Sequence, residues 1–341
     1  MKKCFAAMLC FAMILSTASC KNESVETLTY AVFPYLPDTD YYQQLIESRW
    51  AELEPDIQLI RKEWDCYSDG EPEGIDVIIY DAVMQDTIID AGWIQPIDSS
   101  AVQESDDYFQ FALEGVTVKD KLYGIPVFLC GNFLIYDREC PELAKAEHIT
   151  DLADESDILV MNFEDSVNRP QYIIEVIADV RGEANPSVNS GAEEIIPLID
   201  RLVIEDHKND TDAQVAMAYD SGIGQGYIGF SESMRFLKKR FAETDIKTIS
   251  FSDKENVPRM YADAIAVTAN AKGLRYKKSL ELINVMSDAQ VLTDLSMQDG
   301  NPQYLMLARK SPYQLLSDKF PIYKQMECLA ANEMNHVILT K

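Results

Sequence analysis

Cysteine and histidine are the side chains that most often build nucleophilic or metal-binding sites, and this 341-residue chain contains few of either. Its three histidines, His148, His207 and His336, stand in polar segments that we expect to be exposed to solvent. A zinc site or a cysteine–histidine pair needs histidine beside other ligands or beside a thiol, so both kinds of site are disfavoured. We therefore predict neither a metal ion nor another cofactor.

The cysteines that follow Cys20 fit no disulfide or zinc framework by their spacing, and a chain of this length does not need disulfides to fold. We predict that they are mostly free thiols; they are Cys66, Cys130, Cys140 and Cys328. Cys130 lies within the apolar run at 121–136, KLYGIPVFLCGNFLIY. A cysteine in such a run is usually a small buried core residue, and the pattern alone favours that interpretation over a nucleophile.

A glycine-rich segment at 222–229, GIGQGYIG, could suggest phosphate binding. However, no Gly-Lys-Ser or Gly-Lys-Thr follows it, and no strand and helix bracket it as a phosphate loop requires. We expect these glycines to form a tight turn in which two stretches of backbone approach each other closely.

Short apolar runs alternate with helical periodicities along the chain, which predicts an α/β fold. The run at 75–80, IDVIIY, is continuous, as expected of a strand buried on both faces. A helix should begin at Asp38 or Thr39 and end near Pro55. Further strands are expected at 27–33, 57–64, 158–163 and 228–233, and further helices from about 171 and over about 191–205.

Two segments, 121–136 and 261–267, are expected to cross from one sheet to another. The first is too long for an ordinary strand and is interrupted by Gly-Ile-Pro. Two crossings imply two lobes joined by a hinge above a ligand-binding cleft. We expect each lobe to be a mostly parallel sheet flanked by helices, with lobe 1 formed by 26–132 and 260–300 and lobe 2 by 133–259 and 301–341.

The formal net charge is −27, and the acidic residues are spread over many segments. Such a surface repels nucleic acid and anionic membranes, so we expect neither as a partner. It would also raise the local concentration of a cationic solute, although the charge alone favours plain solubility as the explanation of the acidity. We expect a monomer whose partners are small molecules.

Residues 1–20, MKKCFAAMLCFAMILSTASC, combine two lysines, a short apolar stretch and small residues before Cys20. This pattern predicts an export signal peptide that is too short to span a membrane. Lipid attachment to Cys20 is also expected, although Thr17 stands where lipoprotein signals usually carry Leu, Val or Ile. The protein would then be periplasmic, a cell-surface lipoprotein or secreted, and the alternative is an ordinary secretory signal.

Nearly all of the chain beyond this signal resembles the type I thiaminases, or thiamin pyridinylases, which have a type II periplasmic binding-protein fold. The most specific segments are YGIP followed by Leu-Cys, within 123–136, and IGFSESM at 228–234. Other segments match in the same order; they are FPYLPD (33–38), WDCYSDG (64–70), IDVIIYD (75–81), DAGWIQPI (90–97), MYADAIAV (260–267) and YLMLARKSPY (304–313).

The resemblance implies a transferase that degrades thiamin, with Cys130 as the nucleophile and Glu232 as the general base. The Cys130 thiolate would add to the pyrimidine carbon next to a ring nitrogen, and the thiazole would leave from the bridging methylene. An amine, a thiol or water, deprotonated by Glu232, would then take the place of the thiazole.

The resemblance also implies five substrate-binding residues, namely Asp81, Asp263, Tyr35, Tyr67 and Tyr261. The two carboxylates would hydrogen-bond the aminopyrimidine edge, and the three rings would stack on the substrate. From the sequence alone, Asp81 could equally cap a helix, Asp263 could lie at a strand edge, and any one tyrosine could belong to the core.

The chain departs from the family pattern at three positions. Phe33 and Phe230 stand where the family has tyrosine, and Gly131 stands where it has threonine, so two aromatic hydroxyls near the site are missing. The alternative function is a lipoprotein that binds thiamin or a pyrimidine for an ABC importer without catalysis. A thiol hydrolase is disfavoured because no histidine accompanies the cysteine, and a cysteine together with a glutamate favours the transferase because binding alone requires neither.

Overall fold

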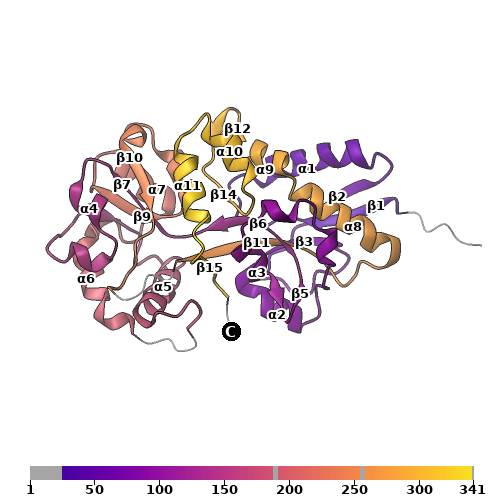
Figure 1. The fold of residues 1–341 in the computed structure, drawn as a ribbon, viewed down its shortest axis with the longest axis horizontal. Coiled ribbons are helices and arrows are strands. Elements are labelled where there is room, and N and C mark those ends of the chain that lie inside the picture. Colours follow the sequence, from indigo (N-terminus) through magenta and orange to yellow (C-terminus); the bar gives the residue numbers. More distant parts are fainter. Residues whose placement is uncertain (1–24, 187–190, 254–257, 340–341) are drawn as a thin grey trace, which may run out of the picture.

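Two mixed β-sheets, each with helices packed on it, organise the residues that the computed structural model describes, 25–186, 191–253 and 258–339 (Figure 1). The predicted signal peptide, including Cys20, lies outside these residues. The two sheets form separate lobes, and the segments that join them pass through the middle of the molecule. The prediction of a two-lobed α/β fold is therefore confirmed.

The first sheet has the strand order β14-β6-β11-β3-β1-β2, with β15 beside β11. Its strands are β1 (Thr27–Ala31), β2 (Gln58–Arg61), β3 (Val77–Asp81), β6 (Ile125–Cys130), β11 (Arg259–Val267), β14 (Met306–Leu307) and β15 (His336–Val337). All residues of β3 are buried, which agrees with its continuous apolar sequence. The central strands β6, β11 and β3 end at the boundary between the lobes or begin there, so their ends can carry a site (Figure 1).

The second sheet has the strand order β10-β7-β9-β8. Its strands are β7 (Phe133–Asp137), β8 (Leu159–Val160), β9 (Gly226–Gly229) and β10 (Thr244–Lys247). The glycines before and within β9 allow the close approach that the sequence predicted. Gly224 has φ of +68°, and a Cβ atom at Gly226 would lie 2.8 Å from a methyl carbon of Leu143.

The sheets are mixed, which corrects the prediction of mostly parallel sheets. In the first sheet β1 is parallel to β2 and β3, whereas β11 is antiparallel to both β3 and β6. The reason lies in the two crossings: β6 leaves the first lobe at Cys130, and β11 enters it at Arg259. Strands that leave and enter a lobe at one place run in opposite directions, so they pair antiparallel.

The C-terminal segment 301–341, which the sequence placed in lobe 2, contacts both lobes. Its strands β14 and β15 pair with β6 and β11 of the first sheet, which differs from the prediction. Its helix α11 (Ile322–Ala330) lies on the second sheet, where the Gln325 side chain accepts a hydrogen bond from the backbone N–H of Ile246 and donates one to Asp245. The segment therefore ties the lobes together.

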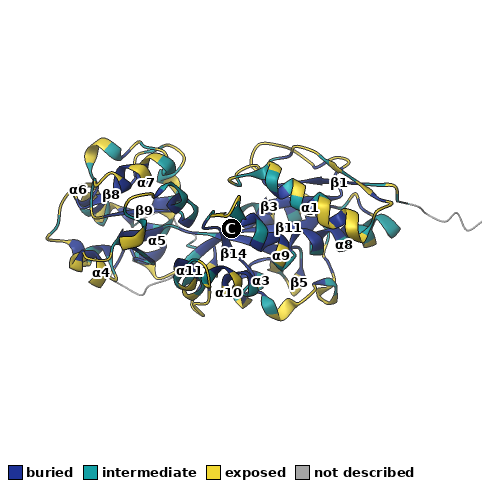
Figure 2. Ribbon diagram, turned by 90° about the horizontal axis from the view of Figure 1, so that it is seen from above, coloured by how far each residue is buried: buried dark blue, intermediate teal, exposed yellow. Residues whose placement is uncertain are grey.

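The longer helices cover the sheets and expose their outer faces (Figure 2). They are α1 (Thr39–Leu53), α5 (Arg169–Arg181), α6 (Ile196–Leu202), α7 (Asp212–Asp220), α8 (Gly273–Met286), α9 (Ala289–Leu295) and α10 (Ser311–Ser317). The prediction for α1 is confirmed: the Asp38 side chain caps it by accepting from the Tyr41 N–H, and Tyr42, Ile46 and Trp50 are buried. Among the described residues, no helix is both long enough and apolar enough to cross a membrane.

The remaining elements are short. The helices are α2 (Gln85–Asp90), α3 (Gln110–Gly115) and α4 (Pro141–Lys145), and the strands form two small hairpins, β4 (Thr117–Val118) with β5 (Lys121–Leu122) and β12 (Met297–Gln298) with β13 (Asn301–Pro302).

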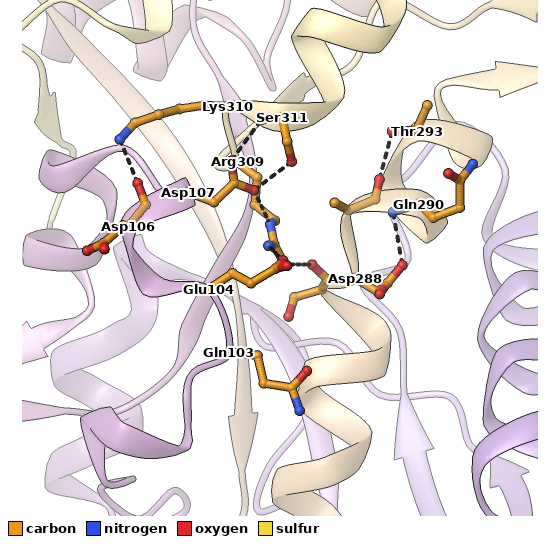
Figure 3. Close-up of polar contacts among 12 residues, drawn as sticks. Gln103, Glu104, Asp106, Asp107, Asp288, Gln290, Thr293, Arg309, Lys310 and Ser311 are labelled. Atoms are coloured by element: carbon orange, nitrogen blue, oxygen red, sulfur yellow. Dashed lines mark hydrogen bonds and ion pairs between the residues drawn. The ribbon is translucent and has the colours of Figure 1, made fainter.

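A buried arginine anchors the C-terminal segment to the first lobe (Figure 3). Arg309 is 2% exposed and lies between β14 and α10. Its guanidinium donates to Asp107 at 2.7 Å, to the Ser287 carbonyl at 3.0 Å and to Glu104. The loop at 104–107, the end of α8 and the start of α10 therefore meet at one cation, which holds β14 in the sheet.

Candidate active site

All seven residues that the sequence predicted for the site, outside the lipidation position, line one cavity of about 1050 Å³ with walls from both lobes. They are Tyr35, Tyr67, Asp81, Cys130, Glu232, Tyr261 and Asp263. Their sequence separation is up to 228 positions, so only the fold brings them together. The volume slightly exceeds the roughly 300–1000 Å³ that single-ligand pockets occupy.

Strand pairing explains why four of these residues are neighbours. β11 lies between β6 and β3, with Tyr261 opposite Cys130 and Asp263 opposite Asp81. Tyr261 and Asp263 are two positions apart, so their side chains project from the same face of the strand. Cys130 and Asp81 are the last residues of their strands, which places the cluster where the sheet opens into the cavity.

Asp81 and Asp263 form a buried carboxyl pair, 6% and 8% exposed. Asp81 accepts hydrogen bonds from the Tyr67 hydroxyl (2.5 Å) and from the Val83 N–H (2.8 Å), so it caps the following 3₁₀ turn as well as lining the cavity. Burial raises the pKa of Asp81, and burial together with the charges of Asp81 and Glu232 raises the pKa of Asp263 well above its usual value.

The carboxyl pair can therefore hold a proton on Asp263 and a negative charge on Asp81. A protonated carboxyl donates a hydrogen bond, whereas an ionised carboxylate accepts one. Together they can bind a heteroaromatic edge in which a ring nitrogen stands beside an amino group. Asp263 lies in the central strand β11, so the alternative of a strand at the sheet edge is wrong.

Cys130 ends β6 and is partly exposed in the cavity wall, which corrects the core-cysteine interpretation that the pattern alone favoured. Burial raises the pKa of its thiol well above the usual value, and the charges of Asp263, Glu232 and Asp81 raise it further. The resting thiol is consequently protonated at neutral pH. To act as a nucleophile, the thiol must lose its proton to a base, and a positive charge nearby makes that loss easier because it stabilises the thiolate.

Glu232 is a carboxyl group in the same cavity that could serve as such a base. It lies in the 3₁₀ helix Ser231–Phe236, directly after β9. The hydroxyl groups on either side fix this helix: Ser231 donates to the Tyr304 carbonyl (2.8 Å) and Ser233 to the Phe230 carbonyl (2.6 Å). Burial raises the pKa of Glu232 to about 7, so it can exchange a proton near neutral pH.

Aromatic rings form the mouth of the cavity on the first lobe. Phe33 and Tyr35 make an edge contact with ring centroids 5.2 Å apart, and Tyr35 and Tyr67 make another at 6.0 Å. Tyr35 and Tyr67 are 63% and 49% exposed, unlike ordinary core rings, and can stack on a planar ligand. Tyr261 is 8% exposed, and its hydroxyl has no hydrogen-bond partner among the described residues.

No group of three or more histidine, cysteine or acidic side chains in the described part of the chain is arranged to hold a metal ion. Cys66, Cys130, Cys140 and Cys328 are all free thiols in the structure, as the sequence predicted.

Comparisons with known proteins identify relatives with the same arrangement of lobes. Thiaminase-1 of Paenibacillus thiaminolyticus is 27% identical over 340 residues, which cover 91% of this chain and 83% of that protein. The structure described as Clostridium botulinum thiaminase I in complex with thiamin superposes with a TM-score of 0.85 at 27% identity, covering 92% of this chain and 94% of that one. The chain therefore resembles the thiaminase I family over nearly its whole length. No family model matches the sequence.

The other solved structures place the family in a wider fold. The thiaminase I of Bacillus thiaminolyticus gives a TM-score of 0.84 at 26% identity, covering 92% of this chain and 94% of that one. The GacH receptor of Streptomyces glaucescens, a structure solved with acarbose, gives 0.67 at 16% identity, covering 92% and 88%. This second likeness shows the periplasmic binding-protein fold alone, as expected from the sequence.

The thiaminase I resemblance left several cavity residues on the second lobe unidentified. Asp212, the first residue of α7, and Asn168, just before α5, both line the cavity. In the sequence Asp212 follows a good helix cap, Thr211, and therefore resembles an ordinary first-turn acid. Glu175, a carboxylate in the apolar run IIEVIADV of the same lobe, is more conspicuous in the sequence, and burial raises its pKa to about 7, but it does not line the cavity.

Two of the three departures from the thiaminase I pattern line the cavity. Phe33 and Phe230 are in its wall and present rings without a hydroxyl. Gly131 is closely packed, because a Cβ atom there would lie 3.3 Å from the Phe133 ring and 3.4 Å from the Arg259 carbonyl oxygen. A threonine at this position would require one of these neighbours to move.

Proposed function

We propose that this protein is a thiamin-degrading transferase that replaces the thiazole of thiamin by another nucleophile through a covalent adduct on Cys130. The observation that carries the proposal is the meeting of Cys130, Glu232 and the Asp81–Asp263 pair in one cavity. A thiol, a base with a pKa of about 7 and a donor–acceptor carboxyl pair match the three requirements of the reaction. The resemblance to the thiaminase I family supports the same chemistry.

In the first half of the cycle, Asp263 and Asp81 hold the aminopyrimidine edge while the exposed Tyr35 and Tyr67 rings cover the substrate. Glu232 takes the proton of the Cys130 thiol, and the sulfur forms a bond to the ring carbon next to a ring nitrogen. The electron pair displaced into the ring then breaks the bond between the methylene and the thiazolium nitrogen. The thiazole leaves as a neutral molecule with that pair, so the positive charge of the substrate drives the step.

In the second half, Glu232 has released the first proton to solvent and takes one from the incoming nucleophile. The nucleophile forms a bond to the methylene carbon, and the displaced electron pair breaks the bond between the ring carbon and the sulfur of Cys130. Glu232 returns its proton to the departing thiolate. The cycle consumes thiamin and one nucleophile and releases one proton to solvent.

The test is to incubate the purified protein with thiamin and aniline and to follow the products by liquid chromatography and mass spectrometry. Free thiazole and a pyrimidine–aniline adduct are expected from the wild type and from Cys328→Ala, whose thiol is exposed and lies outside the cavity. Cys130→Ala should yield neither product. Full activity in Cys130→Ala, or no product from the wild type, would refute the proposal.

The same samples distinguish the transferase from the alternative function, a thiamin-binding protein of an importer. A thiamin-binding protein would bind thiamin reversibly, would retain that binding in Cys130→Ala and would consume no ligand. A chloropyrimidine analogue adds a direct readout, because displacement of chloride by the nucleophile leaves a stable mass increase on Cys130. Absence of that increase at saturating analogue would contradict covalent catalysis.

A further inference from the structure

The second-lobe wall of the cavity contains a carboxylate that the proposed cycle does not use. Asp212, partly exposed, begins α7 and lines the cavity with Asn168 and Glu232. With about 1050 Å³ of space, the cavity is larger than one small ligand needs. The predicted pyrimidine-binding residues belong to the first lobe or to the crossing strands, which leaves the second-lobe wall for another molecule.

The Asp212 carboxylate is held in a fixed orientation by neutral groups. Its Oδ1 accepts a hydrogen bond from the Asn162 amide at 2.7 Å and a longer one from the Asn168 amide at 3.4 Å. The Asn162 oxygen in turn accepts from the Tyr172 hydroxyl at 2.7 Å, and Asn162 and Tyr172 are almost fully buried. A side chain supported in this way keeps its second oxygen in one place.

Within the described residues, Asp212 makes no ion pair and no hydrogen bond through Oδ2. The positive charge of Arg235 acts on Asp212, but Arg235 makes no ion pair with it. The Arg235 guanidinium instead lies 4.6 Å from the centroid of the Phe236 ring and donates to the Glu232 carbonyl oxygen. The start of α7 stabilises a negative charge at Asp212 without providing a partner for Oδ2. A ligand that donates a hydrogen bond would complete the site.

A second, independent observation indicates that a ligand lies in the cavity that this wall lines. The Tyr261 hydroxyl is buried and without a partner among the described residues, and Tyr261 lines the same cavity opposite Cys130 in the strand register. Burial raises the pKa of Tyr172, which supports Asp212 through Asn162, and the charges of Asp212 and Tyr261 raise it further. The Tyr261 hydroxyl and the Asp212 carboxylate therefore line the same cavity as Cys130, and each can take a ligand.

We propose that Asp212, with Asn168 beside it, forms a subsite for the incoming nucleophile and selects primary amines. This inference rests on the proposed transferase function. A primary amine has two N–H groups: Asp212 accepts one and orients the nitrogen, and Glu232 takes the other proton during attack. The step forms the bond from nitrogen to the methylene carbon and breaks the bond from carbon to the Cys130 sulfur, as in the cycle above. A thiol has a single S–H, which Glu232 takes, so it gains nothing from Asp212.

The test compares nucleophiles in Asp212→Asn, with thiamin saturating. In this variant the amide oxygen keeps the hydrogen bond from Asn162 and turns its NH₂ group toward the cavity, so an acceptor becomes a donor. We expect the KM for aniline to rise about tenfold or more, as for loss of a charge-assisted hydrogen bond, with the KM for ethanethiol, which has no other donor, within about twofold of wild type. Asp206→Asn, an exposed acid of the same lobe that does not line the cavity, is the matched control and should change neither value.

The thiol reaction separates this inference from the proposed function. Turnover of thiamin with ethanethiol in Asp212→Asn shows that the variant is folded and that the transferase chemistry is intact. Equal losses with aniline and the thiol, an unchanged KM for aniline, or a KM for thiamin raised as much as that for aniline would each overturn the amine subsite.

A measurement on the wild type does not depend on how a variant folds. N-methylaniline has one N–H, which Glu232 must take, so its KM should exceed that of aniline in the wild type and match it in Asp212→Asn. Equal KM values for the two amines in the wild type would also overturn the proposal.

Discussion

The pKa of Glu232 gives a prediction about the acid limb of the pH–rate profile. Burial raises that pKa from 4.5 to about 7, and only the carboxylate form can act as a base. With a pKa of about 7, the carboxylate is about half of the population at pH 7, about one tenth at pH 6 and about nine tenths at pH 8. The rate should therefore fall about tenfold for each pH unit well below 7 and level off above 8.

The assay is kcat/KM for thiamin between pH 5.5 and 8.5, with aniline as the nucleophile because it stays neutral over this range. Glu232→Gln should lose the base and nearly all of the activity. Glu175 is the matched control, since burial raises its pKa to about 7 as well, and Gln at that position can still accept from the Asn132 amide. Glu175→Gln should keep the acid limb.

Two results would refute this reasoning. A flat wild-type profile between pH 5.5 and 8 would mean that no group with a pKa of about 7 acts as the base. An acid limb that disappears in Glu175→Gln while activity persists would assign the titration to Glu175 instead of Glu232.

Three further predictions concern the frame around the site and export. Arg309→Met should lower the free energy of unfolding in urea by about 3 kcal/mol, because Asp107 would lose its buried cation, while Glu104 is exposed. Arg49→Met, at an exposed ion pair, should lower it by less than about 0.5 kcal/mol. Equal effects would contradict the anchoring role of Arg309. Asp263→Asn should abolish turnover yet raise the melting temperature at pH 8. The pKa of Asp263 is raised in the folded state, so the wild type loses stability as the pH rises above the unfolded pKa of about 3.9. The difference in melting temperature should vanish near pH 4, and a lower melting temperature of the variant at pH 8 would contradict this linkage. We also propose that the chain is exported and lipidated at Cys20, so that labelled palmitate enters the wild type but not Cys20→Ala; no label in the wild type would leave a plain secretory signal.

The sequence predicted the strands and helices of the first half because local patterns decide them. The helix at Thr39–Leu53 has its cap, its buried face and its end within the segment, and β3 is buried on both faces and so carries a continuous apolar run. Strand direction was predicted less well. Whether β11 runs parallel or antiparallel to β6 depends on where the chain crosses between lobes, and that is a long-range property.

The first-lobe residues of the site and Glu232 of the second lobe were predicted through the family resemblance, whereas Asp212 and Asn168 of the second lobe were missed. Cys130 and Glu232 lie in short segments with specific neighbours, so a resemblance can locate them. Asp212 gives no comparable signal, because an acid after a threonine cap is what any helix start would carry. Its place in the cavity follows from the packing of α7 against the 3₁₀ helix that carries Glu232, which no local pattern contains.

The electrostatics of the cavity connect the acidic composition to the chemistry. Asp263, Glu232, Asp81 and Glu175 all raise the pKa of the Cys130 thiol, so a free thiolate is unfavourable in the resting protein. The ionised carboxylates among them favour a cation, and the proposed substrate, thiamin, carries one in its thiazolium ring. Binding of thiamin offsets the negative field and lowers the cost of deprotonating Cys130, and departure of neutral thiazole restores it. Under the proposed function, Cys130 is therefore activated mainly when thiamin is bound, which protects its thiol from reaction with other electrophiles at other times.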